Sequence, residues 1–301
     1  MIDLTNAEDL GNDYGGSEAK KTLMINNKIY LVKFPDPVRG TKCKLSYINN
    51  QFSEYIGCNI LKSIGLDTQN TFLATYDEKN GKHKIVVACE DFCYANNAKL
   101  KEFKKLAVSL TEREENITTS FEFVNYVIEN CDTIKNKKGF KDKFWDMFVG
   151  DALIGNPDRH LENFGLLQSD KISTFAPIYD CGSALSPLIS DEDMEKAMEK
   201  EGVFSGLEYN IPSVFKYKGK RVFYHEIFKN PPSELVEAIE RVVPNIHIFN
   251  IADIINNTEG ISAVKKNYLK HSISMRYEKI LKLAYRKLQK IKSNVKSTAQ
   301  E

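Results

Sequence analysis

The chain has 301 residues, of which 42% are apolar and 28% are charged, and its formal net charge is +1. This composition is typical of a folded globular protein and excludes a disordered chain. The near-neutral charge excludes an overall field that would attract nucleic acid or acidic partners, so any basic surface must be local. No apolar run approaches the roughly 20 residues of a membrane-spanning helix.

Cysteine usage and the N-terminus indicate the cellular setting. Six cysteines stand at positions 43, 58, 89, 93, 131 and 181, without a CxxC pair. In a chain of this length they favour reduced, mostly buried thiols over a disulfide framework. The acidic start "MIDLTNAEDLGND" has neither the basic nor the apolar region of a signal peptide. We therefore expect a cytoplasmic protein, and delivery elsewhere by an unconventional route stays open.

The first 90 or so residues predict a small sheet with one helix, in the order β-β-α-β-β. The strand-like runs Thr22–Ile25 and Lys28–Phe34 flank Asn26-Asn27, which favours a tight hairpin. In "QFSEYIGCNILKSIGL" apolar residues recur at helical spacing, so we predict a helix there. The runs "TFLATY" and "HKIVVACEDF" predict two further strands.

From about residue 98 the pattern becomes helical. The segments "TTSFEFVNYVIENC" and "GFKDKFWDMFVGDALIGN" are both amphipathic, and the strand-like pieces "FGLLQ" and "TFAPIYD" follow them. Helices are predicted again from Ser233 onward. The sequence therefore predicts an α+β protein with two lobes, a small β-rich N-lobe at residues 1–93 and a larger, mainly helical C-lobe at residues 94–301.

The stretch "IGNPDRHLENFG" sets charged and polar side chains between two glycines. Asp158 is followed five residues later by Asn163, which is the spacing of the protein-kinase catalytic loop. In that loop the Asp accepts the proton of the substrate hydroxyl and the Asn holds Mg²⁺. Gly155 and Gly165 make a short irregular loop feasible. The same residues are also typical of a turn in which Asp and Asn cap the backbone locally.

A second carboxylate stands in "APIYDCGSAL", where Asp180 ends a strand-like run. Mg²⁺ prefers oxygen ligands and takes only one or two of them from protein in most sites. Asp180 could supply one such ligand beside Asn163. A strand-end Asp in a turn explains the residue equally well in isolation, but its place after the Asp158–Asn163 pair favours the metal interpretation.

Lys33 lies in the otherwise apolar run "IYLVKF". An isolated Lys beside a core is unfavourable unless it is paired, and Glu54 in the following helix is the predicted partner. Lys33 would then reach the α- and β-phosphates of a nucleotide. The alternative is an edge-strand Lys that points to solvent.

The segment "GGSEAKK" precedes the first strand. It offers the backbone N–H groups of Gly15, Gly16 and Ser17 to phosphates, with Lys20 nearby. A hairpin turn explains a Gly-Gly pair equally well.

The segment "VVACEDF" leaves an apolar strand at Glu90, Asp91 and Phe92, where the two lobes should join. Backbone groups there could pair with an adenine edge, although a strand end that turns polar explains the pattern too. Taken together, the glycine pair, strand Lys, helix Glu, hinge, Asp-Asn pair and final Asp follow the order that a kinase fold requires. They predict phosphoryl transfer.

These motifs resemble the HipA-like family of bacterial Ser/Thr protein kinases. "GGSEAKK" resembles the glycine loop of that family and "LVKF" its nucleotide-binding Lys, while "GNPDRHLENFGLL" and "APIYDCGSAL" resemble its catalytic and metal motifs. The resemblance spans roughly residues 14–187, and within the family it is most similar to the compact, cell-translocating branch.

The resemblance implies a two-lobed protein-kinase-like fold with ATP and Mg²⁺ in the cleft, a protein substrate with a Ser or Thr acceptor, and autophosphorylation. By this resemblance Asp158 is the base and Lys33 contacts the phosphates. On the same basis Asn163 and Asp180 are the metal ligands, and Glu90 and Phe92 contact adenine. The chain begins almost at the glycine loop, without the extra N-terminal subdomain of longer toxin-type members. We therefore expect no direct nucleic-acid binding, and the branch implies delivery into a host cell.

His160 stands two residues after Asp158, where Ser/Thr kinases often have a Lys. We hypothesise that its imidazole donates to the γ-phosphate or supports the loop, while a His bonded to backbone is an equal alternative.

Phosphoinositide kinases and small-molecule phosphotransferases share the Asp-Asn pair, and an inactive nucleotide-binding scaffold is a further alternative. The sequence does not specify the oligomeric state.

Two segments lie outside these motifs. The predicted C-terminal helix, Ile261–Lys296, has eleven Lys or Arg and one acid; it could bind an anionic membrane or a partner, but packing of its apolar stripe on the C-lobe is favoured. The acidic segment Asp191–Glu201 follows Asp180, where kinases have an activation segment, and could dock basic peptides. Ser190 is a predicted helix cap. Candidate autophosphorylation sites are Ser17, Ser183 and Ser186.

Overall fold

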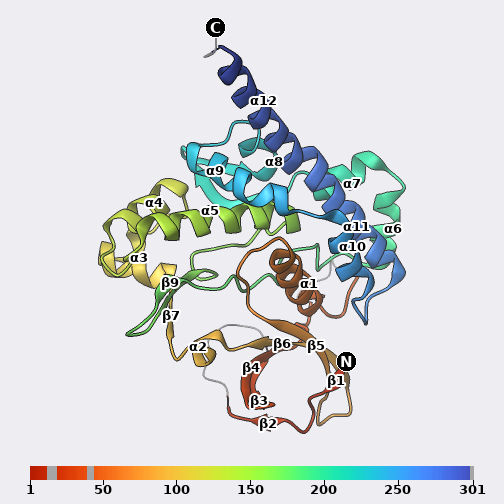
Figure 1. The fold of residues 1–301 in the computed structure, drawn as a ribbon. Helices are drawn as coiled ribbons and strands as arrows, with labels where there is room; N and C mark the ends of the chain where they lie inside the picture. Colours follow the sequence, from red (N-terminus) through yellow and green to blue (C-terminus); the bar gives the residue numbers. More distant parts are fainter. Residues whose placement is uncertain (12–18, 39–43, 299–301) are drawn as a thin grey trace.

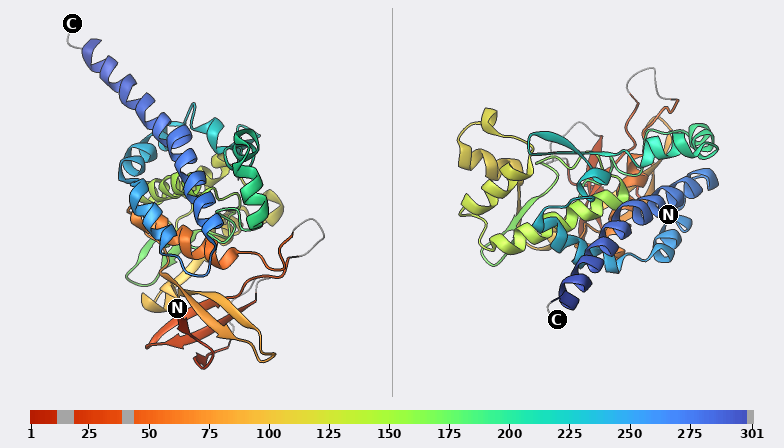
Figure 2. Two further views of the ribbon diagram at one scale, coloured as in Figure 1. Left: turned by 90° about the vertical axis from the view of Figure 1, so that its right-hand side faces the viewer. Right: turned by 90° about the horizontal axis from the view of Figure 1, so that it is seen from above.

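The structure is a computed structural model that describes residues 1–11, 19–38 and 44–298. A β-rich N-lobe sits beneath a helical C-lobe, and the C-terminal helix projects away from both (Figures 1 and 2).

Among the described residues, six strands of the N-lobe form one curled sheet, in the order β1-β5-β6-β4-β3-β2 (Figure 1). The strands are β1 (Ile2–Asp3), β2 (Glu8–Asp9), β3 (Lys20–Ile25), β4 (Lys28–Lys33), β5 (Thr71–Asp77) and β6 (His83–Glu90). The turn between β3 and β4 places Asn26 and Asn27 at φ of 50° and 60°, the left-handed conformation of a tight hairpin turn. The predicted hairpin is therefore confirmed. The acidic N-terminal segment adds the short strands β1 and β2, which the sequence did not predict.

Helix α1 (Asn50–Ser63) lies between the sheet and the C-lobe (Figure 1). Its apolar side chains, among them Ile56 and Ile60, have no exposed surface and belong to the same core as the C-lobe helices. The first turn is buried although it is mostly polar, and Glu54, which directly follows it, is 1% exposed. Buried polar side chains need partners, so this end of α1 faces the polar interior of a site.

A second sheet connects the lobes. After β6 the chain forms α2 (Phe92–Ala95) and β7 (Lys99–Glu102), and β7 pairs antiparallel with β8 (Gly165–Gln168), which pairs with β9 (Ser173–Phe175). The register sets Glu102 opposite Gly165. The segment after the lobe junction therefore lies beside the end of the predicted catalytic loop.

Helix α5 (Lys137–Ile154) forms the centre of the C-lobe, and its side chains from Phe144 to Ile154 are all buried. The other helices and the hairpin that surround it are α3 (Phe103–Thr111), α4 (Phe121–Asn130), α6 (Asp191–Met198), α7 (Glu201–Glu208), β10 (Pro212–Tyr217), β11 (Lys220–Phe223), α8 (Tyr224–Ile227), α9 (Ser233–Val242), α10 (Ile248–Asn256), α11 (Ala263–Arg276) and α12 (Lys282–Thr298). The predicted helices over residues 118–131 and 139–156 correspond to α4 and α5 and are confirmed.

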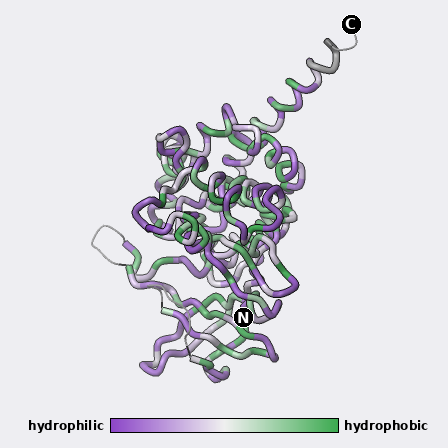
Figure 3. Tube along the Cα trace, turned by 90° about the vertical axis from the view of Figure 1, so that its left-hand side faces the viewer, coloured by the Kyte–Doolittle hydropathy of each residue, from purple (hydrophilic) through white to green (hydrophobic). Residues whose placement is uncertain are grey.

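The predicted C-terminal helix is α11 and α12 joined by a π-helical turn, Tyr277–Leu281. Its apolar stripe packs on the C-lobe through Leu269, Ile273 and Ile280, whereas Ile291 is 51% exposed. Helix α12 projects from the body, and hydrophobic and hydrophilic residues alternate along its coloured part (Figure 3). In the described part of the chain, no helix combines the length and the hydropathy that crossing a membrane requires.

Candidate active site

A cleft of about 1190 Å³ lies between the two lobes. Lys33, Asp158, Asn163 and Asp180 all line it, although 147 positions separate Lys33 from Asp180. The structure therefore brings together the four residues that the sequence singled out for catalysis and metal binding.

Lys33 joins the lobes through two carboxylates. Its Nζ lies 3.1 Å from Oε2 of Glu54 on α1 and 3.0 Å from Oδ1 of Asp180 in the C-lobe. Lys33 is 12% exposed and Glu54 only 1%, so the pair is largely shielded from solvent. The predicted Lys33–Glu54 ion pair is confirmed.

Asp180 is the more accessible of these two carboxylates, with a side chain that is 35% exposed. Its backbone has a φ of 58°, an uncommon conformation for a residue other than Gly. The Lys33 ammonium outweighs the opposing effect of burial and holds the pKa of Asp180 below its ordinary value. Asp180 is therefore ionised at neutral pH and is suited to bind a cation.

The predicted catalytic loop begins where α5 ends, at Gly155, whose φ of 66° forms a left-handed helix cap. Asp158 is exposed to the cleft, while Asn163 is buried and donates from Nδ2 to the backbone oxygen of Asp158 at 3.0 Å. The loop ends at Gly165, where a Cβ would lie 2.2 Å from the Lys101 carbonyl oxygen on β7. Both glycines are needed, one for its backbone conformation and one for a close approach.

Arg159 is the centre of a buried network that the sequence analysis missed. Its guanidinium donates two hydrogen bonds of 3.0 Å to the carboxylate of Asp151 on α5, and the two side chains are 1% and 0% exposed. Arg159 also donates to the backbone oxygens of Asn163 and Tyr179. One side chain therefore ties the catalytic loop to α5 and to the segment that ends at Asp180.

Asn156 extends this network to Asp158, the predicted base. Its Nδ2 donates to Asp151 at 3.0 Å, and its Oδ1 accepts from the Asp158 N–H at 3.1 Å. The Tyr224 hydroxyl donates to the Asn156 carbonyl at 2.6 Å. An Asp in the apolar helix segment "MFVGDALI" was the available signal, because a buried carboxylate requires a cationic partner.

His160 lines the cleft with a side chain that is 38% exposed. Its Nδ1 accepts the backbone N–H of Glu162 at 3.3 Å, which assigns the ring proton to Nε2. The backbone contact that the sequence analysis held as the alternative is therefore present, and Nε2–H is the ring donor not used in it. Ser183 lies nearby, and its hydroxyl is 3.4 Å from Oδ2 of Asp158.

The three residues at the lobe junction differ in position. Asp91 and Phe92 line the cleft, but Glu90 does not. The Glu90 side chain is bound to Lys28 and Asn70, and its carbonyl accepts from Nε2 of Gln69 at 3.0 Å. Glu90 thus faces away from the cleft with its carbonyl already in use, and of the three residues that the sequence predicted as adenine contacts only Asp91 and Phe92 line the cleft.

The predicted glycine loop, Gly15, Gly16 and Ser17, lies outside the described residues. Lys20, which follows it on β3, lines the cleft and pairs with Lys33 in the β3–β4 register.

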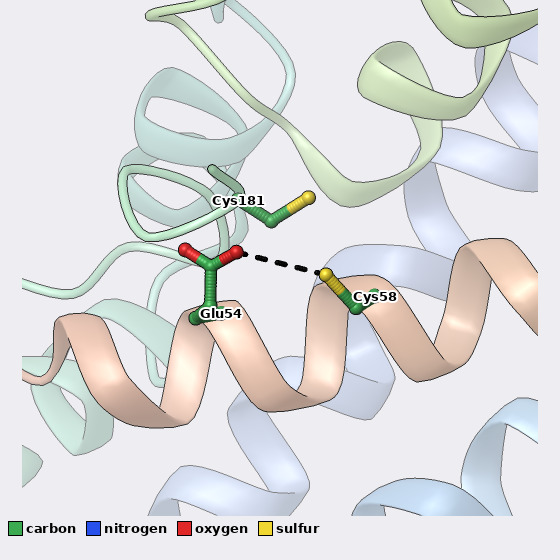
Figure 4. Close-up of side chains that lie close together, drawn as sticks. All are labelled: Glu54, Cys58 and Cys181. Carbon is green, nitrogen blue, oxygen red and sulfur yellow. Dashed lines mark hydrogen bonds between the residues drawn. The ribbon is translucent and has the colours of Figure 1, made fainter. Parts of the chain in front are cut away.

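Glu54, Cys58 and Cys181 place their side-chain ligand atoms within 4.8 Å of one another (Figure 4). The Cys58 thiol lies 3.7 Å from Oε1 of Glu54, and its interaction with Cys181 together with burial raises its pKa. Arg159 donates to Cys181 Sγ at 3.5 Å, which places a positive charge against the trio. A protonated Cys58 thiol and the nearby Arg159 guanidinium disfavour a cation, so we interpret this trio as packing that positions Glu54. The five described cysteines are all free, as predicted.

Asn163 and Asp180 are the residues that fit a hard cation. The amide nitrogen of Asn163 is bound to the backbone, and no described residue donates to its Oδ1. Asp180 contributes an ionised carboxylate in the same cleft. Oxygen donors of this kind are the ligands that Mg²⁺ prefers.

The predicted cap at Ser190 is confirmed, because its hydroxyl accepts from the Asp193 N–H at the start of α6. Ser186 donates to Glu208 at 2.6 Å, so its hydroxyl is engaged in a buried network with Arg276. Of the two described serine candidates, Ser183 is the exposed one.

Comparisons with known proteins agree with this geometry. The HipA-like C-terminal domain family matches residues 13–246. Serine/threonine-protein kinase CtkA of Helicobacter pylori strain J99 is 37% identical over 279 residues, which are 90% of this chain and 83% of that protein. The crystal structure of a Helicobacter pylori proinflammatory kinase CtkA has a TM-score of 0.87 and 35% identity, covering 96% of this chain and 98% of that one.

A more distant match is HipA of Shewanella oneidensis MR-1, in a structure with HipB and operator DNA. It has a TM-score of 0.54 at 14% identity and covers 91% of this chain and 67% of that one, a likeness of fold alone. The predicted two-lobed, kinase-like fold is confirmed by these structural matches.

Proposed function

Because this chain belongs to the family of the HipA-like C-terminal domain, we propose that it is a serine/threonine-protein kinase that uses ATP and Mg²⁺. The observation that supports this most is the bridge from Lys33 to Glu54 and Asp180 across the cleft. It sets a cation and an ionised carboxylate beside Asp158 and Asn163, the arrangement that phosphoryl transfer needs.

Each residue has a role set by its surroundings. Asp158, exposed in the cleft, accepts the proton of the substrate hydroxyl, and Asn156 and Asn163 fix the backbone on either side of it. Glu54 holds Lys33 in position to neutralise negative charge in the cleft. Asn163 and Asp180 would hold the metal. When bound, ATP supplies the phosphoryl group and Mg²⁺ neutralises its charge.

The proposal includes autophosphorylation. Ser183 is exposed, and its hydroxyl already contacts the carboxylate of Asp158 at 3.4 Å. Ser186 is engaged with Glu208, and Ser17 lies outside the described residues. Ser183 is therefore our candidate acceptor within the chain.

The test compares wild type with Asp158→Asn, with exposed Asp170→Asn as the matched control. Asp158→Asn should lower transfer of phosphate from labelled ATP by about 10²–10⁴-fold, because it removes the proton acceptor. Binding of an ATP analogue should change little, and mass spectrometry of the wild-type chain should place phosphate on Ser183. Asp170→Asn should behave as wild type, since it lies outside the cleft.

Full activity of Asp158→Asn would refute the proposed base. Offering protein and phosphoinositide substrates side by side separates the classes, because label in the lipid alone would make this a lipid kinase. Nucleotide binding without transfer to either would make it an inactive scaffold.

His160 has a second, separable part in the proposal, in which its Nε2–H donates to the γ-phosphate. The variant that separates this role from a purely structural one is His160→Asn, because the Asn oxygen can still accept the Glu162 N–H while the shorter amide places no N–H at the position of Nε2. We expect His160→Asn to lower kcat by about tenfold, the worth of one hydrogen bond to a charged group, with ATP affinity little changed. If kcat equals that of wild type, His160 only supports the loop.

A further inference from the structure

A second cavity, of about 500 Å³, lies at the first turn of α1 and shares no lining residue with the kinase cleft. Residues from four separate segments line it, including Phe52 of α1, Asp191 of α6 and Lys265 of α11. It is therefore a place where the N-lobe helix meets the segment after Asp180 and the C-terminal helices.

Lys265 is a buried cation at this cavity. The residue is 4% exposed, and its amine has no hydrogen-bond partner among the described residues. Its contact with the Phe52 ring is distant, at 6.0 Å to the ring centre. Burial lowers its pKa to about 8 against the opposing effect of Asp191. An ammonium that is buried without a hydrogen-bond partner is costly, which favours a site that receives an anion.

Three helix N-termini converge on the same cavity. The residues that precede α1, α6 and α11 are Asn49, Ser190 and Ser262, and each of them lines it. N-terminal backbone N–H groups and the helix dipole attract anions. Neither α1 nor α11 has an acidic residue in its first turn to offset this.

The acidic side chains nearby belong to α6. Lys44 lies 3.3 Å from Glu192 and 2.7 Å from Asp193, so those carboxylates already have a cation. Asp191 remains as the carboxylate that faces Lys265 across the cavity. Asp191 therefore balances the Lys265 ammonium, and the acidic first turn of α6 offsets the dipole of that helix. The N-termini of α1 and α11, which have no acidic residue in their first turns, leave the cavity positive.

We propose that this cavity binds a phosphate group, either as free phosphate or as a small phosphate monoester. The ammonium of Lys265 and the Ser262 hydroxyl are its ligands, the dipoles of α1 and α11 add attraction, and the flexible Lys stem turns the amine toward it. The cavity is larger than one phosphate requires, which leaves room for an organic group. Because α1 also holds Glu54, a bound phosphate braces the helix that positions Lys33.

The test is a calorimetric titration of the full chain with sodium phosphate and with N-acetyl-O-phosphoserine amide, at constant ionic strength set with sodium chloride. Wild type should bind at least one of these two compounds saturably. The compound with the higher affinity shows whether the cavity is suited to free phosphate or to a phosphate monoester. Lys265→Met, which keeps the length of the stem, should bind at least tenfold more weakly. The matched control is Lys266→Met, because Lys266 points to the Asn256 carbonyl and does not line the cavity.

Lys33→Met separates this site from the kinase cleft, because phosphate bound at Lys33 would be lost in that variant and phosphate bound at Lys265 would persist. Should Lys265→Met fail to fold, Lys265→Gln and Ser262→Ala replace it. Saturable binding that survives Lys33→Met and is lost with Lys265→Met supports the proposal. No binding by wild type, or equal binding by the Lys265 variants, would overturn it.

Stability against pH is an independent readout. The folded pKa of Lys265, about 8, lies below its ordinary 10.5, so the unfolded chain binds more protons between these values. Without phosphate, the unfolding free energy of wild type should therefore rise relative to Lys265→Met as pH increases from 8 to 10.5. Lys265→Met should be the more stable below pH 8, and parallel curves would show that Lys265 is not the buried cation on which the proposal rests. Lys44, Asp191 and Glu192 are present in both chains and cancel from the comparison.

Discussion

Arg159 shows how one side chain can organise a site without contacting substrate. It is buried between Asp151, with which it forms two parallel hydrogen bonds, and the backbone oxygens of Asn163 and of Tyr179, the residue before Asp180. Breaking a buried pair by removing one partner leaves an uncompensated charge. The position of Asp180 therefore depends on a residue that is itself hidden from the cleft.

Arg159→Met should lower the unfolding free energy by about 3–5 kcal/mol, because Asp151 is 0% exposed and would be left charged and unpaired. Urea unfolding measures this, and kcat should fall as the loop loses its anchor. The double variant Asp151→Asn/Arg159→Met removes both charges and should be more stable than Arg159→Met alone. If Arg159→Met costs less than about 1 kcal/mol, the pair contributes no more than an exposed one.

The sequence was sufficient to predict Lys33, Glu54, Asp158, Asn163 and Asp180 as one group, because their residue types and order are specific to one chemistry. It signalled a buried carboxylate at Asp151 but not that Arg159 is its partner, because that pairing and the bonds of Arg159 to backbone oxygens are set by tertiary contact. Nor could it show that Glu90 faces away from the cleft. That orientation depends on Lys28 and Asn70, which the curled sheet brings beside it.

At the scale of elements, β7 and β8 fix where the predicted catalytic loop ends. Glu102 and Gly165 are opposite each other in the ladder, and the backbone of β7 approaches Gly165 too closely for a side chain. The sequence predicted β8 from "FGLLQ" but not β7, because "KLKE" is mostly charged and its pairing is set by tertiary contact. The sequence did not predict the hairpin β10–β11 either, because its segment lacks strand-like alternation.

Gly165→Ala should lower the unfolding free energy by about 1–3 kcal/mol, since the new Cβ would lie 2.2 Å from the Lys101 oxygen and must displace backbone. Because Asn163 is two residues away, kcat should fall as well. The matched control is Gly206→Ala inside α7, where a Cβ meets nothing within 4 Å. That variant should gain about 0.5–1 kcal/mol from helix propensity. A stable, fully active Gly165→Ala would show that β7 can move away from the loop.

At the scale of the whole molecule, the two lobes do not have equivalent cores. A small cluster, which includes Leu23, Val32 and Val86, is confined to the N-lobe sheet and its N-terminal segment. The main cluster is continuous from α1 and the other face of the sheet into the C-lobe. The proposed division at residue 93 stays a prediction. Because one hydrophobic core extends across it, we expect residues on both sides to fold as one unit.

Residues 1–93 expressed alone should therefore not fold cooperatively, because α1 would expose the apolar face that it buries against the C-lobe, and small domains have little stability to spare. Circular dichroism should show no cooperative thermal transition for this fragment. In the full chain, fluorescence of Trp145, the single tryptophan, reports the C-lobe, in which it is 2% exposed. Circular dichroism reports both lobes, so coincident urea transitions from the two probes would indicate one folding unit. A folded fragment, or a circular-dichroism transition that precedes the fluorescence change, would mean that the N-lobe is stable without its partner.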